Sequence, residues 1–252
     1  MIPVGDDNSD RIRTPWINYL LIAINLFVFV YYQHLGGNTQ FTYSYVTVPA
    51  EITSGHDIVT NAMVVTDPVS GQQEHIPGLG VTPIPVWLTL ITSIFMHGGI
   101  AHVLGNMLYL WIFGDNIENV LGHFKYLIFY LLCGVIASLT HVFVVYIFGQ
   151  NDLIPVLGAS GAISGIMGAY LRLFPFRKVK VLFIIFIIRF PAYLVLGLWI
   201  LLQISDGVGM LGGGQGTAIA YGAHIGGFLA GMFLIYKFEP VFATFKPRKT
   251  YR

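Results

Sequence analysis

Charged side chains are scarce in this sequence. Asp, Glu, Lys and Arg make up 10% of the 252 residues and apolar side chains 55%, whereas a soluble domain carries about 25% charged residues. Because the mean hydropathy is +0.71, we expect a lipid bilayer to surround most of the chain. The formal net charge of +1 supplies no basic surface for nucleic acid, which excludes that class of partner.

Cysteine is almost absent as well. Cys133 is the single one, so an intrachain disulfide and a cysteine metal cluster are both excluded. The metalloprotease pattern H-E-x-x-H is missing, and no pair of aspartates lies in the apolar segments to share a proton as an aspartyl protease requires. We therefore expect neither a metal nor another cofactor.

Long apolar runs are abundant, and most approach the roughly 20 residues that an α-helix needs to cross a bilayer. The candidate spans are 16–34, 86–113, 124–148, 160–174, 190–205 and 217–238. The sequence thus predicts an all-α polytopic membrane protein with six transmembrane helices in one domain, 16–240. A polar segment, 1–15, precedes it and a basic tail, 241–252, follows. Because segment 1–15 resembles neither a signal nor a transit peptide, we expect the first helix to be retained.

Most of the thirteen basic residues lie in every second segment that flanks the spans. They gather before the first span and after the second, fourth and sixth, whereas the loops 35–85, 149–159 and 206–216 contain no Lys or Arg. Lys and Arg are enriched in cytoplasmic loops. We therefore expect both termini to be cytoplasmic and these three loops to face outward, in the plasma or inner membrane of a prokaryotic cell.

Two segments outside the spans carry weaker signals. The outward loop 35–85 has a weak strand-like pattern at Tyr43, Tyr45 and Val46, and we expect it to be partly ordered against the helices. Segment 181–188 is apolar but precedes Arg189. We expect this segment to lie along the cytoplasmic surface, with the fifth span beginning near Pro191, because Arg189 can then reach water.

Four polar residues stand inside apolar runs, where they are costly and therefore functional candidates: His102, Asn106, Ser160 and His224. His102, Ser160 and His224 lie at similar distances from the polar inner ends of three spans that run in the same direction. At about 1.5 Å per residue each distance is roughly 20 Å. The pattern predicts that three spans bring polar groups to one level of the membrane.

The fourth span is too short to cross the bilayer, so its N-terminus is expected to start inside the membrane. Gly158 and Gly161 flank Ser160 there, while Gly227 and Gly231 follow His224 on the sixth span. Small residues let two helix backbones approach closely. We therefore expect the fourth and sixth spans to pack closely enough for His224 to hydrogen-bond Ser160.

These residue types favour acyl transfer. A serine is a weak nucleophile until a base accepts its proton, and histidine is the commonest base. His102 and Asn106 are spaced to share one face of a helix. There they could join the backbone N–H of Ser160, at a helix N-terminus that favours negative charge, in stabilising an oxyanion.

The three motifs together resemble those of the rhomboid family of intramembrane serine proteases. The resemblance rests on H-G-G-I-A-H-V-L-G-N at 97–106, G-A-S-G at 158–161 and A-H-I-G-G at 223–227 followed by Gly231, and covers about 85–240. It implies a Ser160–His224 dyad, oxyanion stabilisation by His102 and Asn106, and membrane-spanning protein substrates. Where some rhomboids place an aromatic residue four positions after the nucleophile, this chain has Ser164, which leaves open what orients His224. The loop 35–85 also lacks the Trp-Arg pair of some members.

Two other functions stay open. A catalytically silent rhomboid-like protein could bind membrane clients without cutting them, although it would not need both Ser160 and His224. A small channel or transporter would account for buried histidines but not for a serine at a truncated helix start. We expect six other histidines to be non-catalytic: His34, His56, His75, His97, His123 and His141. The sequence does not specify the natural substrate, the cleavage site or the oligomeric state.

Overall fold

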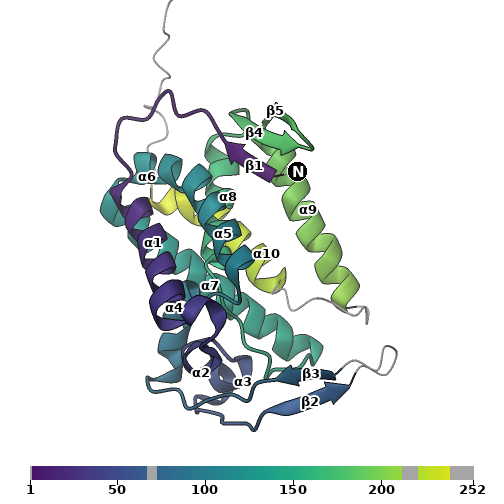
Figure 1. Cartoon of the computed structure of the whole chain (residues 1–252). Coiled ribbons are helices and arrows are strands. Elements are labelled where there is room, and N and C mark those ends of the chain that lie inside the picture. Colours follow the sequence, from purple (N-terminus) through teal and green to yellow (C-terminus); the bar gives the residue numbers. More distant parts are fainter. Residues whose placement is uncertain (1, 67–72, 212–220, 239–252) are drawn as a thin grey trace, which may run out of the picture.

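The computed structural model describes residues 2–66, 73–211 and 221–238. Helices dominate it, and they run between two ends of the molecule that each carry a small sheet (Figure 1). The long helices are α1 (Trp16–Phe27, continued by a π-helical stretch Val28–Tyr32), α5 (Ile100–Tyr109, continued by a π-helical stretch Leu110–Gly114 and α6, Asp115–Leu121), α7 (His123–Phe148), α8 (Ser160–Leu173), α9 (Ala192–Leu211) and α10 (Tyr221–Phe238).

Five of the six expected spans correspond to helices, with ends shifted by a few residues. The second differs. Residues 86–113 form a short helical segment, Val86–Leu88, α4 (Thr89–Thr92) and Ser93–Phe95, which bends by 81° before α5. Gly99 at the bend has an extended backbone (φ 167°). The prediction of one continuous helix here was wrong, because the Gly-Gly pair at 98–99 interrupts a run that hydropathy alone joins.

Length and apolarity identify few of these helices as membrane spans by themselves. In the described part of the chain, α7 alone meets both criteria, and the bent pair Val86–Phe95 and Ile100–Leu121 meets them if it is counted as one span. Trp16–Tyr32 and Ala192–Val208 are shorter apolar helices. The tail 241–252 and the start of the expected sixth span, 217–220, lie outside the described residues.

Helix α8 lies at the centre, packed between α7 and α10 through residues that have little or no side chain. A Cβ at Gly231 or Gly227 of α10 would overlap the carbonyl oxygen of Gly165 or Gly161 of α8. On the other side of α8, Gly165 leaves room for Cys133 of α7, which is buried. The close approach predicted for the fourth and sixth spans is therefore present.

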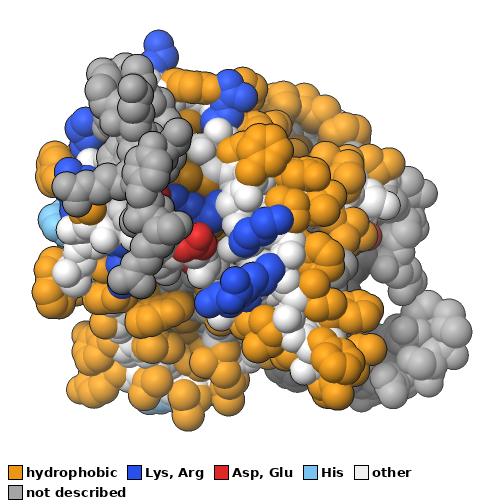
Figure 2. Space-filling view, turned by 90° about the horizontal axis from the view of Figure 1, so that it is seen from above, with side chains coloured by type: hydrophobic (Ala, Val, Ile, Leu, Met, Phe, Trp, Pro, Cys, Tyr) orange, Lys and Arg blue, Asp and Glu red, His pale blue; other side chains and the backbone are white. Residues whose placement is uncertain are grey.

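One end of the molecule is a polar cluster that holds the N-terminal segment. Strand β1 (Ile2–Gly5) pairs with β4 (Lys178–Phe183), which pairs with β5 (Phe186–Pro191), all antiparallel. Asp6 accepts hydrogen bonds from Tyr170 (2.6 Å) and Asn116 (2.8 Å). Figure 2 looks onto this end and shows Lys and Arg side chains gathered among apolar ones.

The molecule is mostly helical, as the all-α prediction expects, and these short strands are an addition at one end that was not predicted. Residues 181–188 are not part of a span, as expected, but they form most of a β-hairpin, and α9 begins at Ala192, close to the expected Pro191.

The opposite end is formed by loop 35–85. It contains a 3-10 turn (His34–Gly36), α2 (Thr39–Ser44), α3 (Pro49–Ser54) and the hairpin of β2 (Met63–Thr66) with β3 (Gln73–Ile76). The strand-like pattern at Tyr43 and Tyr45 was misleading, because Asn38 caps α2 by accepting a hydrogen bond from the N–H of Phe41. Thr47 ties the loop to the connection between α7 and α8 through its bridge to Val156.

Candidate active site

Ser160 and His224 meet at the centre of the bundle. Ser160 is the first residue of α8, and His224 lies in the first turn of α10. The Ser160 hydroxyl oxygen is 2.8 Å from Nε2 of His224, which is a hydrogen bond. The predicted contact between these two side chains is thus present, and both are only partly buried. The glycine contacts between α8 and α10 set this distance by holding the two helix backbones together.

Gln203 contacts the other nitrogen of the His224 ring. Its side-chain oxygen lies 2.5 Å from Nδ1, and an amide oxygen can only accept a hydrogen bond. The contact is a hydrogen bond when Nδ1 carries the proton, and in that tautomer Nε2 of a neutral ring is free to accept the proton of Ser160. Trp199, one turn before Gln203 on α9, lies against the same ring with centroids 5.9 Å apart. These two residues orient His224.

The sequence reasoning missed both Gln203 and Trp199. Gln203 falls inside the apolar run 190–205, so hydropathy absorbs it into a span. The rule that selected the other polar residues could have found it, since a side-chain amide in a membrane segment also needs a partner. Ser164, where an aromatic residue was considered, donates its hydroxyl to the carbonyl oxygen of Ser160 (2.6 Å) and so belongs to the helix backbone.

His102 and Asn106 reach the same place from α5. A Cβ at Gly158 would lie 2.9 Å from the His102 ring and 3.6 Å from the Asn106 amide nitrogen. Both side chains therefore lie against the backbone two residues before Ser160. The Asn106 amide nitrogen is buried and has no hydrogen-bond partner among the described residues. A buried donor without a partner is costly, which is what a group reserved for a transient oxyanion would show.

The turn that leads into α8 depends on Gly158. Its φ of 118° lies in the region that side chains rarely adopt, and the His102 ring occupies the space of a Cβ. Its N–H donates to the carbonyl oxygen of Ser93 (2.9 Å), while the Ser93 hydroxyl lies 3.0 Å from that of Thr47. The loop 35–85 thus supports the turn before Ser160 from outside, a link that the sequence does not reveal.

Two other histidines, His97 and His141, lie inside the helix bundle. His97 is fully buried beside His102, with ring centroids 5.2 Å apart, and its backbone N–H donates to Gln33. His141 lines a cavity of about 130 Å³ between α7, α9 and α10, next to Tyr221 and Ile225. It has no contact with Ser160. Among the described residues, no cluster of three or more His, Cys, Asp or Glu could hold a metal ion.

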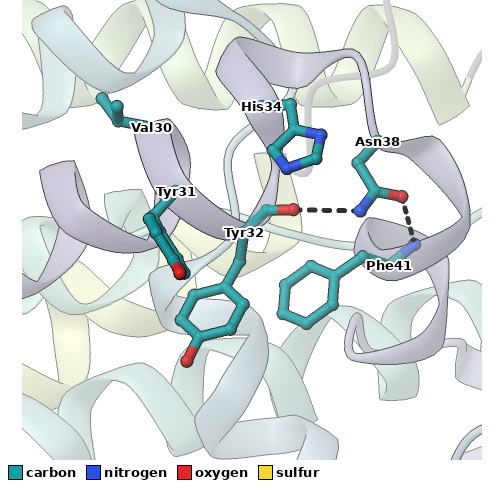
Figure 3. A pocket seen from close by; sticks show the side chains of 6 residues that line it. All are labelled: Val30, Tyr31, Tyr32, His34, Asn38 and Phe41. Atoms are coloured by element: carbon teal, nitrogen blue, oxygen red, sulfur yellow. Dashed lines mark hydrogen bonds between the residues drawn. The ribbon is translucent and has the colours of Figure 1, made fainter.

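A larger open groove lies away from these residues. It measures about 490 Å³ and is formed by the end of the first helix and the turn that follows (Figure 3). Asn38 crosses it, donating to the carbonyl oxygen of Tyr32 (3.1 Å) and accepting from the N–H of Phe41 (3.1 Å). Tyr32 and Phe41 stack at 5.3 Å. These contacts order the start of loop 35–85.

Comparison with known proteins agrees with the geometry. The family model described as "Rhomboid domain" matches residues 85–240. The chain is 39% identical over 85 residues to Rhomboid protease GluP of Bacillus subtilis, covering 34% of this chain and 15% of that protein. It is 33% identical over 150 residues to Presenilin-associated rhomboid-like protein A, mitochondrial, of Danio rerio, covering 59% and 37%. It is 29% identical over 146 residues to Rhomboid protein 1, mitochondrial, of Saccharomyces cerevisiae, covering 58% and 40%. Each match spans less than half of the relative's length.

Proposed function

The chain belongs to the rhomboid family, whose members are integral to membranes, and on that premise we propose that it is an intramembrane serine endopeptidase. The observation that carries the proposal is the 2.8 Å contact between the Ser160 hydroxyl and Nε2 of His224 at the start of a short central helix. Its substrates are proteins with membrane-spanning segments. The named protease among its relatives supports the reaction type.

The chemistry follows from the hydrogen bonds around the dyad. The Ser160 oxygen attacks the scissile carbonyl carbon while Nε2 of His224 takes the hydroxyl proton. The resulting imidazolium keeps its Nδ1–H on Gln203 and then gives the Nε2 proton to the departing amine. Water hydrolyses the acyl-enzyme by the same steps, and no metal or cofactor takes part.

The oxyanion is stabilised by groups that already surround Gly158. The amide nitrogen of Asn106, the His102 ring and the backbone N–H of Ser160 supply donors, and the first N–H groups of a helix have no partner inside that helix. His102 is exposed while Asn106 is buried, and both lie near the backbone of Gly158. Each donor of this kind contributes about 10²- to 10³-fold in rate.

The proposed placement in the membrane has six spans, with the segment 86–121 as a broken second one and the N-terminal sheet on the cytoplasmic side. Apolar side chains exposed on the helices, such as Phe27 (55%), Phe143 (62%) and Leu201 (63%), would contact lipid. Aromatic residues collect at membrane interfaces, and the first helix carries Trp16 at one end and Tyr31 at the other, both exposed.

Covalent labelling tests the activated serine directly. A fluorophosphonate probe should modify wild-type protein in lipid at Ser160, located by peptide mass spectrometry, and should not modify His224→Ala. Ser164→Ala, one turn away on the same helix, should label normally. Folded wild-type protein that leaves Ser160 unmodified would favour the client-binding alternative.

A further inference from the structure

The hairpin of β4 and β5 ends in apolar side chains that point away from the protein. The exposed fractions are 80% for Ile184, 77% for Ile185, 65% for Phe186 and 63% for Ile187. Contiguous exposed apolar residues of this size mark a contact surface. The hairpin lies at the edge of the molecule beside the start of α9 (Figure 1). Its residues belong to no helix, so contact between the helices and lipid does not explain why these apolar side chains are exposed.

The turn of this hairpin is built from residues that a turn disfavours. Strand pairing ends at Phe183 and Phe186, which leaves Ile184 and Ile185 as a two-residue connection. Such connections favour Asn-Gly or Asp-Gly because they require positive φ. Ile184 has a φ of +57°, an outlier for a β-branched residue. An apolar side chain is therefore kept at the tip despite an unfavourable backbone conformation, which points to a role outside folding.

The base of the hairpin is held rigidly at the level where α9 begins. Val179 and Val181 of β4 are fully buried and pack in the main core together with Ala192 of α9. Pro191, the last residue of β5, directly precedes Ala192. A six-residue strand is about 20 Å long. The tip therefore cannot move far from the membrane surface that α9 crosses.

The charges at the base have one sign. Lys180 lies directly opposite Arg189 in the strand register, and Lys178 is two pairs further from the tip. Like charges facing each other across a strand pair are destabilising. None of the three has an ion-pair partner within the part of the chain that the structure describes, and residues 153–205 contain no Asp or Glu. Asp7 of the N-terminal segment acts electrostatically on Arg189, but one carboxylate does not balance three basic side chains, and an anionic surface outside the protein would supply the rest.

We propose that this hairpin is a membrane anchor: residues 184–187 enter the cytoplasmic leaflet, and Lys178, Lys180 and Arg189 bind anionic lipid headgroups. A bilayer presents headgroups and acyl chains in adjacent layers, in the same order as the basic base and the apolar tip. The anchor would fix the start of α9, the helix that carries Gln203 and Trp199. It rests on the proposed cytoplasmic placement of this end and not on catalysis.

The test places a fluorophore at the tip of the full chain in lipid nanodiscs. Cys133 is buried, so Ile185→Cys can be labelled selectively with an environment-sensitive dye; Ser9→Cys, exposed on the same end, is the matched control. Both carry Ser160→Ala, which makes the result independent of proteolysis. In phosphatidylcholine mixed with phosphatidylglycerol, the label at 185 should emit at shorter wavelength, be quenched by doxyl-labelled lipid and resist iodide. The label at 9 should be quenched by iodide.

Two comparisons make the result decisive. Changing Lys180 and Arg189 together to Gln should abolish the gain in lipid quenching that anionic discs give over phosphatidylcholine discs. A tip label that iodide quenches as strongly as the label at Ser9, in both lipids, would overturn the proposal. Shielding found only in discs that hold two copies of the protein would also overturn it, because it would identify a protein contact. An anchored tip, found together with wild-type protein that cuts no reporter, would contradict the proposed function alone.

Discussion

At the scale of single residues, a substitution of Asn106 distinguishes most clearly between a catalytic role and a packing role. Its buried amide nitrogen has no hydrogen-bond partner among the described residues, so removing this nitrogen breaks no hydrogen bond in the resting protein. If it stabilises the oxyanion, Asn106→Ala should lower kcat by about 10²- to 10³-fold with unchanged thermal stability. Wild-type turnover in this variant would assign Asn106 to packing. Kinetics on a reporter substrate and a melting curve together decide the point.

Gln203 should act through His224. Replacing it with Leu removes one neutral hydrogen bond, which contributes about 0.5–1.5 kcal/mol, or roughly 2- to 10-fold in rate. The loss should fall on kcat and on the rate of Ser160 labelling. Gln203→Glu keeps an oxygen acceptor at Nδ1 and should retain most of the activity. Equal losses in the Leu and Glu variants would show that the hydrogen bond is not what matters.

The sequence predicted the dyad but not its support, and the reason is physical. Ser160 and His224 could be identified from the sequence because small residues surround them and ionisable groups are rare in apolar runs. The Ser93 carbonyl accepts a hydrogen bond from the N–H of Gly158, and the Thr47 hydroxyl contacts the Ser93 hydroxyl, yet backbone carbonyls have no sequence signature. Ser93 and Thr47 are also common residue types. Contacts between distant loops of this kind require the fold itself.

At the scale of elements, the contact between α8 and α10 should tolerate no added atom. A Cβ at Gly231 would overlap the Gly165 carbonyl oxygen, whereas one at Gly197 of α9 meets nothing within 4 Å. Gly231→Ala should therefore destabilise the protein by about 1–3 kcal/mol through overpacking. Gly197→Ala should be neutral or stabilising, by up to about 1 kcal/mol, because alanine favours a helix. Unfolding in mild detergent compares them, and a neutral Gly231→Ala would refute the close packing.

The N-terminal segment should dock in a pH-dependent way. Burial raises the pKa of Asp6 from 3.8 to about 6, beside Asp7, Asp115, Tyr170 and Arg177. The folded state binds this proton more tightly, so the contribution of Asp6 to stability is complete below its unfolded pKa. It is lost as pH rises through about 6, on the order of 2–3 kcal/mol in total.

Asp6→Asn should therefore flatten the stability profile between about pH 4 and 6, because the amide keeps an acceptor for Tyr170 and Asn116 without titrating. Asp7→Asn is the control: hydrogen bonds to Ser9 lower the pKa of Asp7, which places its titration below this window. Limited proteolysis of residues before Trp16 across this range measures the docking. The same slope in wild type and Asp6→Asn would exclude Asp6 as its source.

Helix-scale features were predictable where composition changes abruptly. The start of α8 at Ser160 and the whole of α7 follow from polar and glycine residues at their boundaries. The break between α4 and α5 could not be predicted in this way, because residues 86–113 form one apolar run and the bend depends on two glycines. The hairpin at 178–191 was partly predicted: Arg189 excluded a span, but β-branched residues also occur in helices.

The molecule as a whole brings its reactive residues together by having three helices cross near one point. Asn106 lies on α5, Ser160 on α8 and His224 on α10, and a fourth helix, α9, carries Gln203. The sequence predicted this convergence from equal depth in the membrane. Relatives named as mitochondrial show that family membership does not determine the compartment, so placement in a plasma or inner membrane stays a prediction.

The most direct measurement is cleavage of a reporter membrane protein in reconstituted vesicles by wild type, Ser160→Ala and His224→Ala, with Ser164→Ala as the matched control. The account predicts cutting by wild type and Ser164→Ala and none by the two dyad variants. Equal cutting by all four would reveal a contaminating protease or another nucleophile. Folded wild-type protein that cuts none of several reporters would contradict the proposed protease activity.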